Sequence, residues 1–438
     1  MSRKFAFVLF FISAIIHAQN HFEFETNKSK IKIPFKLINN LIFVPVKVNG
    51  VELNFLVDTG VEETILLSLE DKGDVSFFNV EKIKLKGLGN DIAIEGLKSS
   101  ANVMDMNGFT DKHHDLYIVL DENFNFSTHV GIPVNGIIGY HFFKNHVVEI
   151  DYEHKNIIVY NDGKKIRKKL TSKFNAVPIS IERNKPYLET EITINSNPIP
   201  AKLLIDVGNS DALWLFSDRQ KQIDVPTIHF ADYLGRGFSG EIHGNRARIS
   251  KMVFGKFEFN DPIIAFPDSA STKSVTMVKD RAGSIGSEVL KRFTVVFDYP
   301  NKKMYLKKNS NFNMPFHYNM SGVELQNEGM QWVQETVKLE TVPGAGSYDI
   351  NGNKNDFRYK FTLKPVYLIS DIRQNSAAAL CGLQKGDVLS RINGLPAYRY
   401  SLSEINDILK SEEGKWISFE VTRNGKALKF KFQLKRLL

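Results

Sequence analysis

Two aspartates occupy equivalent places in two similar stretches of this chain of 438 residues. Asp58 follows the apolar run 53–57 and opens the triplet Asp-Thr-Gly, while Asp206 follows the run 203–205 and opens Asp-Val-Gly. A carboxylate at the end of a buried strand, with a glycine two residues later, can be held against a second carboxylate around one water. Two adjacent carboxylates cannot both ionise, so such a pair shares a proton and supplies an acid and a base together. The pattern indicates hydrolysis by paired carboxyl groups.

The two stretches stay similar well beyond the triplets. A glycine-bounded apolar segment follows at 136–139, 78 positions after Asp58, and again at 283–286, 77 positions after Asp206. In both halves an apolar strand pattern, a polar turn and a second apolar strand come next. A unit repeated at this interval is the size of one lobe, so the sequence predicts two similar lobes built mainly of strands.

Both halves resemble the lobes of retropepsin-type aspartic proteases, and together they resemble the two-lobed pepsin-like arrangement over roughly residues 30–310. The resemblance implies a mainly β fold of duplicated acid-protease β-barrel lobes. It also implies an endopeptidase that cuts peptides or unfolded protein through one activated water, with no metal and no cofactor. Asp58 and Asp206 would be catalytic. The supporting residues would be Thr59, Gly60, Val207, Gly208 and Ser210 in the acid loops and Ile138, Gly139, Ile285 and Gly286 in the segments behind them.

Each half departs from that family pattern at one supporting position. In the family, the hydroxyl after each aspartate bonds across to the other loop, and Val207 keeps the shape of threonine without the donor. Losing one such bond costs about 1 kcal/mol, and leaving its buried partner unpaired costs roughly 1 to 3 kcal/mol. Two positions after each glycine the family usually carries Ser or Thr. Ser210 fits, but Glu62 does not and would raise the pKa of Asp58 if it lay nearby.

A different pattern begins after about residue 312. The segment 379–394 closely resembles a bacterial PDZ domain, and a capping box from Ser401 to Glu404 then opens an amphipathic helix. PDZ domains bind a peptide along an exposed strand edge, beside a loop that holds the peptide carboxylate. The candidate groove residues are Gly322, Val323 and Leu325. The alternative is a PDZ domain that takes no free ligand and only packs on the protease-like region.

The ends of the chain indicate an exported protein in three folded parts. Residues 1–18 have the basic start, apolar centre and small-residue end of a secretory signal, which predicts a periplasmic or extracellular location. No later segment is long and apolar enough to span a membrane. The overall likeness is to bacterial envelope proteins that join a protease-like region to a PDZ domain. The predicted boundaries are 1–18 for the signal, 19–165 and 166–312 for the lobes and 313–438 for the PDZ domain.

Charge and cysteine content exclude other classes. The formal net charge of +8 is scattered, and the one dense basic run, 164–169, falls between the lobes. A solvated connector is therefore favoured over a nucleic-acid surface, and no nucleic-acid partner is expected. Cys381 is the only cysteine, so core packing rather than disulfides must hold both lobes.

Two motifs could suggest other chemistry, but their contexts do not fit. The glycines at 235, 237 and 240 match a dinucleotide fingerprint, yet a strand-like alternation follows them instead of a helix. We interpret this segment as the hairpin over the cleft in the second lobe, and 87–96 as its counterpart in the first. His113-His114-Asp115 lacks the partners of a metal motif and is predicted to be a surface loop.

Three functions remain compatible with these residues. The first is an active aspartic peptidase whose PDZ domain presents substrate. The second is a catalytically impaired, protease-like protein that binds peptides without cutting them, which Val207 would favour. The third is an interaction module in which the PDZ domain carries the function.

Overall fold

The computed structural model describes residues 21–69, 75–85, 94–120, 126–237, 240–272, 278–338 and 357–438. The predicted signal peptide lies outside these ranges, as does most of the hairpin predicted at 87–96. None of the helices in the described ranges is long and apolar enough to cross a membrane.

The first lobe is a sheet of nine strands in which β9, β6, β10, β5 and β4 are hydrogen-bonded neighbours in that order. β10 runs parallel to β5 and antiparallel to β6. The lobe contains β1 (Glu23–Phe24), β3 (Lys36–Ile38), β4 (Leu41–Val48), β5 (Val51–Val57), β6 (Thr64–Leu66), β7 (Glu81–Leu85), β8 (Ile94–Met106), β9 (Phe109–Val119), α1 (Phe126–Val130), β10 (Gly136–Ile138) and α2 (Tyr140–Phe143).

The second lobe repeats this arrangement in a sheet of ten strands, with the order β22, β17, β23, β16 and β15. β23 runs parallel to β16 and antiparallel to β17, as β10 does to β5 and β6. The lobe contains β14 (Ser180–Glu182), β15 (Lys185–Ile194), β16 (Asn197–Ile205), β17 (Leu213–Leu215), η1 (Arg219–Lys221), β18 (His229–Gly237), β19 (Gly240–Arg248), β20 (Lys251–Phe254), β21 (Phe257–Asn260), β22 (Ile263–Pro267), α4 (Ser269–Thr272), β23 (Arg281–Ile285) and α5 (Ser287–Leu290).

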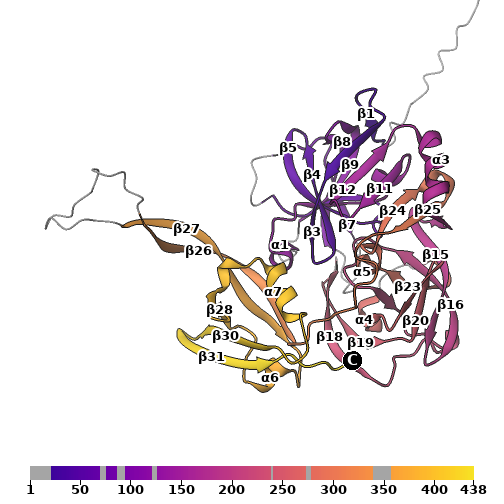
Figure 1. Ribbon diagram of the computed structural model, residues 1–438. Coiled ribbons are helices and arrows are strands. Elements are labelled where there is room, and N and C mark those ends of the chain that lie inside the picture. The colour runs from indigo at the N-terminus through magenta and orange to yellow at the C-terminus, as the bar shows by residue number, and fades with distance from the viewer. Residues whose placement is uncertain are drawn as a thin grey trace, which may run out of the picture.

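A third sheet joins the lobes, and its strand order β2-β12-β11-β24-β25-β13 is symmetric about the central antiparallel pair β11 and β24. Apolar residues of both lobes pack into one continuous core beside it. Such a core explains how two lobes without a disulfide form one body (Figure 1). The elements are β2 (Lys30–Pro34), β11 (Val147–Asp151), β12 (Asn156–Tyr160), α3 (Gly163–Lys173), β13 (Asn175–Pro178), β24 (Phe293–Asp298), η2 (Tyr299–Asn301) and β25 (Lys303–Lys308).

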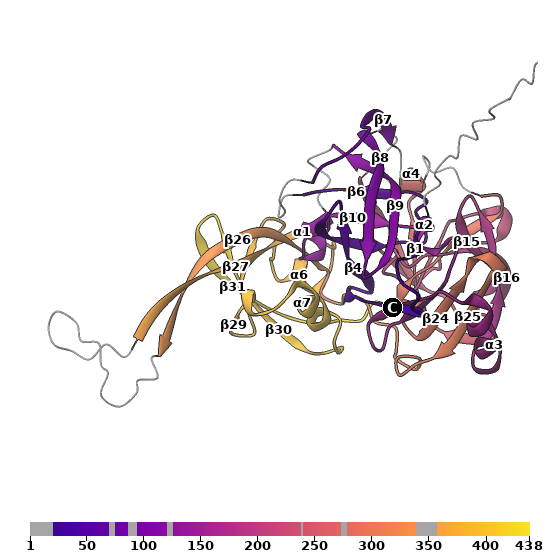
Figure 2. The ribbon, with the colours of Figure 1, turned by 90° about the horizontal axis from the view of Figure 1, so that it is seen from above.

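The C-terminal part forms its own sheet, β26-β27-β28-β30-β31, with β29 paired to β28. The long hairpin of β26 and β27 extends away from the rest of the molecule (Figure 2). The elements are β26 (Val323–Lys338), β27 (Phe357–Ile372), α6 (Ala377–Leu380), β28 (Val388–Ile392), β29 (Leu395–Pro396), η3 (Ala397–Arg399), α7 (Leu402–Leu409), β30 (Trp416–Arg423) and β31 (Lys426–Gln433). The expected capping box forms, because Ser401 and Glu404 each accept a backbone N–H of the other.

Three local expectations can be compared with the structure. Gly235, Gly237 and Gly240 lie in β18 and β19, which pair as an antiparallel hairpin, as predicted. The basic run lies in α3, where Arg167 binds Asp298 through two hydrogen bonds and so ties the connector to the shared sheet. The surface-loop prediction for His114 is wrong. Its side chain is fully buried in β9 and bonds Thr64 and Asp111, because the alternation of this strand turns it inward.

Candidate active site

Each aspartate follows a buried strand that pairs with a glycine-bounded strand behind it. β5 leads into Asp58, whose backbone N–H donates to the Ile138 carbonyl at 2.9 Å. β16 leads into Asp206, whose N–H donates to the Ile285 carbonyl, also at 2.9 Å. The two acids therefore occupy equivalent positions in the two lobes, as the repeat predicts.

Gly139 and Gly286 allow the acid loops to lie directly against these strands. A Cβ on Gly139 would lie 2.0 Å from the Val61 carbonyl oxygen. A Cβ on Gly286 would lie 2.2 Å from the Asp211 carbonyl oxygen. Any larger residue would push the acid loop away from its strand, since close-packed interiors cannot absorb such overlaps without shifting.

The carboxyl groups of Asp58 and Asp206 converge, because a Cβ on Gly60 would lie 3.0 Å from Asp58 Oδ1 and 3.2 Å from both carboxyl oxygens of Asp206. The Gly60 N–H donates to Asp58 Oδ1 at 2.6 Å, and the Gly208 N–H donates to Asp206 Oδ1 at 3.0 Å. A Cβ on Gly208 would lie 2.2 Å from Cγ of Asp58, so glycine is required for the opposite carboxyl to approach this closely.

Thr59 links the two acid loops from one side only. Its buried hydroxyl donates to the Ile205 carbonyl at 2.7 Å and accepts the Val207 N–H at 3.1 Å. Val207 is also fully buried but carries no hydroxyl to make the equivalent pair of bonds in the other direction. Only one of the two hydroxyl contacts that a symmetric pair of loops would make is therefore present.

Burial raises the pKa of both acids, but their surroundings separate them. For Asp58 the charge of Asp206 adds to burial and holds the pKa well above its ordinary value. For Asp206 the charge of Arg281 and the hydrogen bond from Asp58 oppose the effect of burial on the pKa. Two adjacent buried carboxyl groups cannot both ionise, so the pair shares a proton, and the charge of Arg281 favours the ionised form of Asp206.

Two cations beside the pair were not found from the sequence. Lys185 begins β15, and the pKa of its ammonium is lowered by burial, against the opposing charge of Asp58. Arg281 begins β23, where its Nη2 donates to Ser284 Oγ at 2.8 Å and its guanidinium lies over the Phe216 ring. Neither cation forms a salt bridge with a carboxylate in the described part of the chain, so their charges act on the acid pair over a longer range.

An asparagine at the tip of the first hairpin of each lobe reaches the acid loop of the other lobe. Asn40, between β3 and β4, donates to the Ser210 carbonyl at 2.8 Å. Asn184, between β14 and β15, donates to Glu62 Oε1 at 2.5 Å. Both asparagines have positive φ, which marks them as turn residues, but only the fold shows that the turns cross between lobes.

These contacts correct the expectation for one of the two supporting positions. Glu62 binds Asn184 and is not among the groups that chiefly set the pKa of Asp58. For Ser210, the contact within the described residues is made by its carbonyl rather than by its hydroxyl. The position two residues after each glycine therefore joins the lobes in this chain.

In the C-terminal domain, the candidate groove residues are Gly322, Val323 and Leu325. The backbone N–H groups of the loop beside them already form hydrogen bonds within the domain. The N–H groups of Ser321 and Gly322 donate to Asn319 Oδ1 at 3.0 and 3.2 Å, and that of Val323 donates to Ser321 Oγ at 3.0 Å. Val323 and Leu325 are buried in the domain core. A peptide carboxylate bound at this loop would have to displace these internal bonds.

The first lobe also lies against this groove. α1 packs on β26, and a Cβ on Gly131, just after α1, would lie 3.0 Å from Cβ of Leu402 in α7. Asn406 of α7 donates to Asn39 of the first lobe at 3.4 Å. The two elements that flank a PDZ peptide groove, β26 and α7, therefore both touch the first lobe (Figure 1).

Comparison with known proteins identifies the C-terminal domain. A family model described as a PDZ domain matches residues 368–423. Among solved structures, the crystal structure of an aspartic proteinase from Irpex lacteus is similar to this chain, with 14% sequence identity and a TM-score of 0.44 over 65% of this chain and 99% of that one. No curated protein matches the chain. With the strand orders given above, the prediction of a mainly β chain with duplicated lobes and a C-terminal PDZ domain is confirmed.

The described residues contain no group of three or more His, Cys, Asp or Glu side chains arranged to hold a metal ion. Asp58 and Asp206 each accept the N–H of the glycine two residues later, and their carboxyl groups converge. An ionised acid beside a protonated one can remove a proton from a water and donate another to a carbonyl oxygen.

Proposed function

We propose that this protein is an exported aspartic-type endopeptidase that hydrolyses peptide bonds in peptides or unfolded proteins and carries a peptide-binding PDZ domain. The observation that supports it most is the convergence of the Asp58 and Asp206 carboxyl groups at equivalent ends of two equivalent strands. Export to the periplasm or the cell exterior is part of the proposal and rests on the sequence of residues 1–18.

In the proposed reaction, a water lies between the two carboxyl groups. Asp206, held ionised by Arg281 and Lys185, removes a proton from the water as its oxygen attacks the scissile carbonyl carbon. Asp58, protonated because burial and Asp206 raise its pKa, donates its proton to the carbonyl oxygen. Asp206 then gives the proton it took to the leaving nitrogen, while Asp58 takes one back from a hydroxyl of the tetrahedral intermediate, so the C–N bond breaks with no covalent enzyme intermediate.

Cleavage of an unfolded protein tests this proposal. The mature protein should degrade denatured casein at some pH between about 3 and 8, and Asp58→Asn and Asp206→Asn should each abolish the activity. A pepstatin-type inhibitor should block the wild-type protein. Persistent cleavage by Asp58→Asn would assign the activity to a contaminant and contradict the proposal.

The alternative is a catalytically impaired protein that binds peptides in the same cleft. The specific observation that favours it is the one-sided contact of Thr59, because Val207 has no hydroxyl to hold the loop of Asp58 as Thr59 holds the loop of Asp206. This alternative predicts peptide binding without cleavage at any pH, and equal binding by Asp58→Asn and wild type.

A further inference from the structure

A chain of four alternating charges runs from the loop of Asp206 to the PDZ domain. Asp211 Oδ1 binds Arg246 Nη1 at 2.8 Å, and Arg246 Nε binds Asp232 Oδ2 at 2.6 Å. Asp232 Oδ1 then binds Arg373 Nε of the C-terminal domain at 3.2 Å. The most exposed of these side chains is 16% accessible, so solvent does little to screen the contacts.

The series of ion pairs begins at Asp211, beside the acid loop of the candidate active site. Asp211 is five positions after Asp206, and its carbonyl lies against Gly286, which directly follows the strand β23 behind the acid loop. The other oxygen of its carboxylate accepts the Trp214 indole N–H at 2.7 Å. Arg246 and Asp232 belong to β19 and β18, the hairpin interpreted as covering the cleft.

The other end lies at the candidate groove of the PDZ domain. Arg373 Nη2 donates to the Asn319 carbonyl at 2.6 Å, and the Arg373 N–H donates to the Gly322 carbonyl at 2.8 Å. Asn319 is the residue whose side chain accepts the N–H groups of the groove loop. A single arginine thus contacts both the loop and the hairpin of the second lobe.

Apolar contacts hold the PDZ domain in place around this arginine. The guanidinium of Arg373 lies 4.1 Å from the centroid of the Phe230 ring in β18, which packs on Tyr318. Ile263 of the second lobe belongs to the hydrophobic core of the PDZ domain. The domain is therefore docked on the lobe and not suspended from a free linker.

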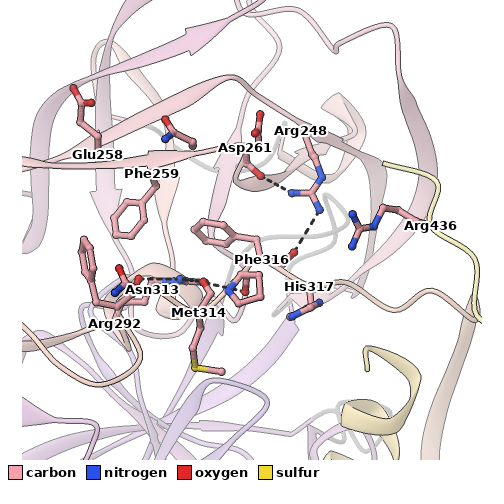
Figure 3. A pocket seen from close by; sticks show the side chains of 13 residues that line it. Arg248, Glu258, Phe259, Asp261, Arg292, Asn313, Met314, Phe316, His317 and Arg436 are labelled. Carbon is pink, nitrogen blue, oxygen red and sulfur yellow. Dashed lines mark hydrogen bonds between the residues drawn. The ribbon is translucent and has the colours of Figure 1, made fainter. Parts of the chain in front are cut away.

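The linker itself is fastened to the second lobe (Figure 3). Arg292, almost fully buried, donates to the carbonyls of Phe312, Met314 and Pro315. Arg248 donates to the Phe316 carbonyl at 3.4 Å. The neighbouring pocket, which Arg248, Arg292 and Arg436 line, contains neither aspartate of the pair, and two of its three arginines are committed to these carbonyls.

We propose that the PDZ domain positions the candidate active site, with Arg373 holding the β18–β19 hairpin through Asp232 and the loop of Asp206 through Arg246 and Asp211. Arg246, Asp232 and Arg373 are positioning residues in this account, since the described contacts place none of them on the acid pair itself. The kinetic part of the inference rests on the proposed peptidase function, and the structural part does not.

The test compares Arg373→Gln with Arg423→Gln in the full-length protein. Arg423 forms a two-bond pair with Asp387 inside the PDZ domain, so it controls for loss of an ion pair in the same domain. With a short quenched peptide amidated at its C-terminus, Arg373→Gln should lower kcat at least ten-fold and change KM less than three-fold. Arg423→Gln should leave kcat within two-fold, and Arg373→Lys should recover part of the loss.

A second readout does not need catalysis. The Trp214 indole N–H resonance, measured in an Asp58→Asn background, should shift with Arg373→Gln and stay in place with Arg423→Gln. This result would support the structural coupling even if the wild-type protein cut no peptide, an outcome that would remove only the proposed function. An unmoved Trp214 resonance in Arg373→Gln, or equal kinetic effects of the two glutamine variants, would overturn the inference.

Discussion

The acid loops of the two lobes have the same backbone but different side-chain support. In both loops the aspartate N–H bonds the supporting strand and a glycine N–H bonds the carboxylate. Only the first loop has a hydroxyl, Thr59, that reaches across to the other lobe. The backbone geometry is thus set by the strands and glycines, and the hydroxyl contributes to holding the two carboxyl groups in line.

The lobes also differ in charge around the pair. Lys185 and Arg281 both come from the second lobe, as does Asp206. The charge of Arg281 opposes the effect of burial on the pKa of Asp206, whereas the charge of Asp206 adds to burial in raising the pKa of Asp58. An almost symmetric backbone therefore holds two acids in different electrostatic surroundings.

Removing the remaining cross-lobe hydroxyl should lower catalytic activity more than any other predicted substitution of a supporting residue in these loops. Thr59→Val would leave the Ile205 carbonyl and the Val207 N–H buried without their partner. Each unpaired group costs about 1 to 3 kcal/mol, so we expect kcat/KM to fall roughly 10- to 100-fold. Steady-state cleavage of a quenched peptide measures this, with Thr59→Ser as the control that keeps the hydroxyl. Unchanged activity in Thr59→Val would show that the contact has no role in catalysis.

Giving the second loop the same hydroxyl should raise catalytic activity, by less than the loss of Thr59 lowers it. Val207→Thr adds the missing hydroxyl at a buried position of matching shape. A gain of about 1 kcal/mol would raise kcat/KM about five-fold. The same peptide assay measures it, with Val207→Ala as the control for packing. A fall in activity would mean that valine, and not threonine, fits this loop.

The pH dependence of the unfolding free energy should show the effect of burying the acid pair. The folded-state pKa of Asp58 is raised, so the native protein binds more protons than the unfolded chain once pH exceeds the ordinary aspartate value. Stability therefore falls as pH rises through that window. We expect Asp58→Asn to raise the Tm by a few degrees at pH 7, and this gain should disappear below about pH 4. Calorimetry at the two pH values decides, and an equal shift at both would contradict the raised pKa.

The weakest expected effect concerns Lys185, one of the two second-lobe cations near the acid pair. Lys185 lowers the pKa of both acids, so Lys185→Met should move both limbs of the pH–activity profile upward. The pH dependence of kcat/KM measures the shift, and Lys202→Met serves as a control, because Lys202 is paired with Glu182. A downward shift in Lys185→Met would contradict the electrostatic account.

Much of this fold could be predicted because the pattern of one lobe occurs twice in the sequence. Each acid triplet and each glycine-bounded segment has a partner at nearly equal spacing, and glycine is needed behind the acid loop because a Cβ on Gly139 would lie 2.0 Å from the Val61 carbonyl oxygen. Local capping rules likewise predicted the helix that begins after Ser401.

Contacts between distant segments could not be predicted in this way. Asn40 and Asn184 read as ordinary turn residues, and Arg281 has no motif around it. The ion chain through Asp232 depends on how the PDZ domain docks, which no local pattern encodes. His114 was misplaced for the same reason, because a histidine in a polar-looking segment gave no sign of the buried partner Thr64.

The central claim is that two carboxyl groups, remote in sequence, titrate as one unit. A ¹³C NMR titration of the aspartate side chains, assigned with Asp58→Asn and Asp206→Asn, tests it most directly. The account predicts that Asp58 keeps its proton well above the ordinary aspartate range and that its pKa falls when Asp206 becomes asparagine. Two independent titrations at ordinary values, each unchanged by substitution of the other residue, would contradict it.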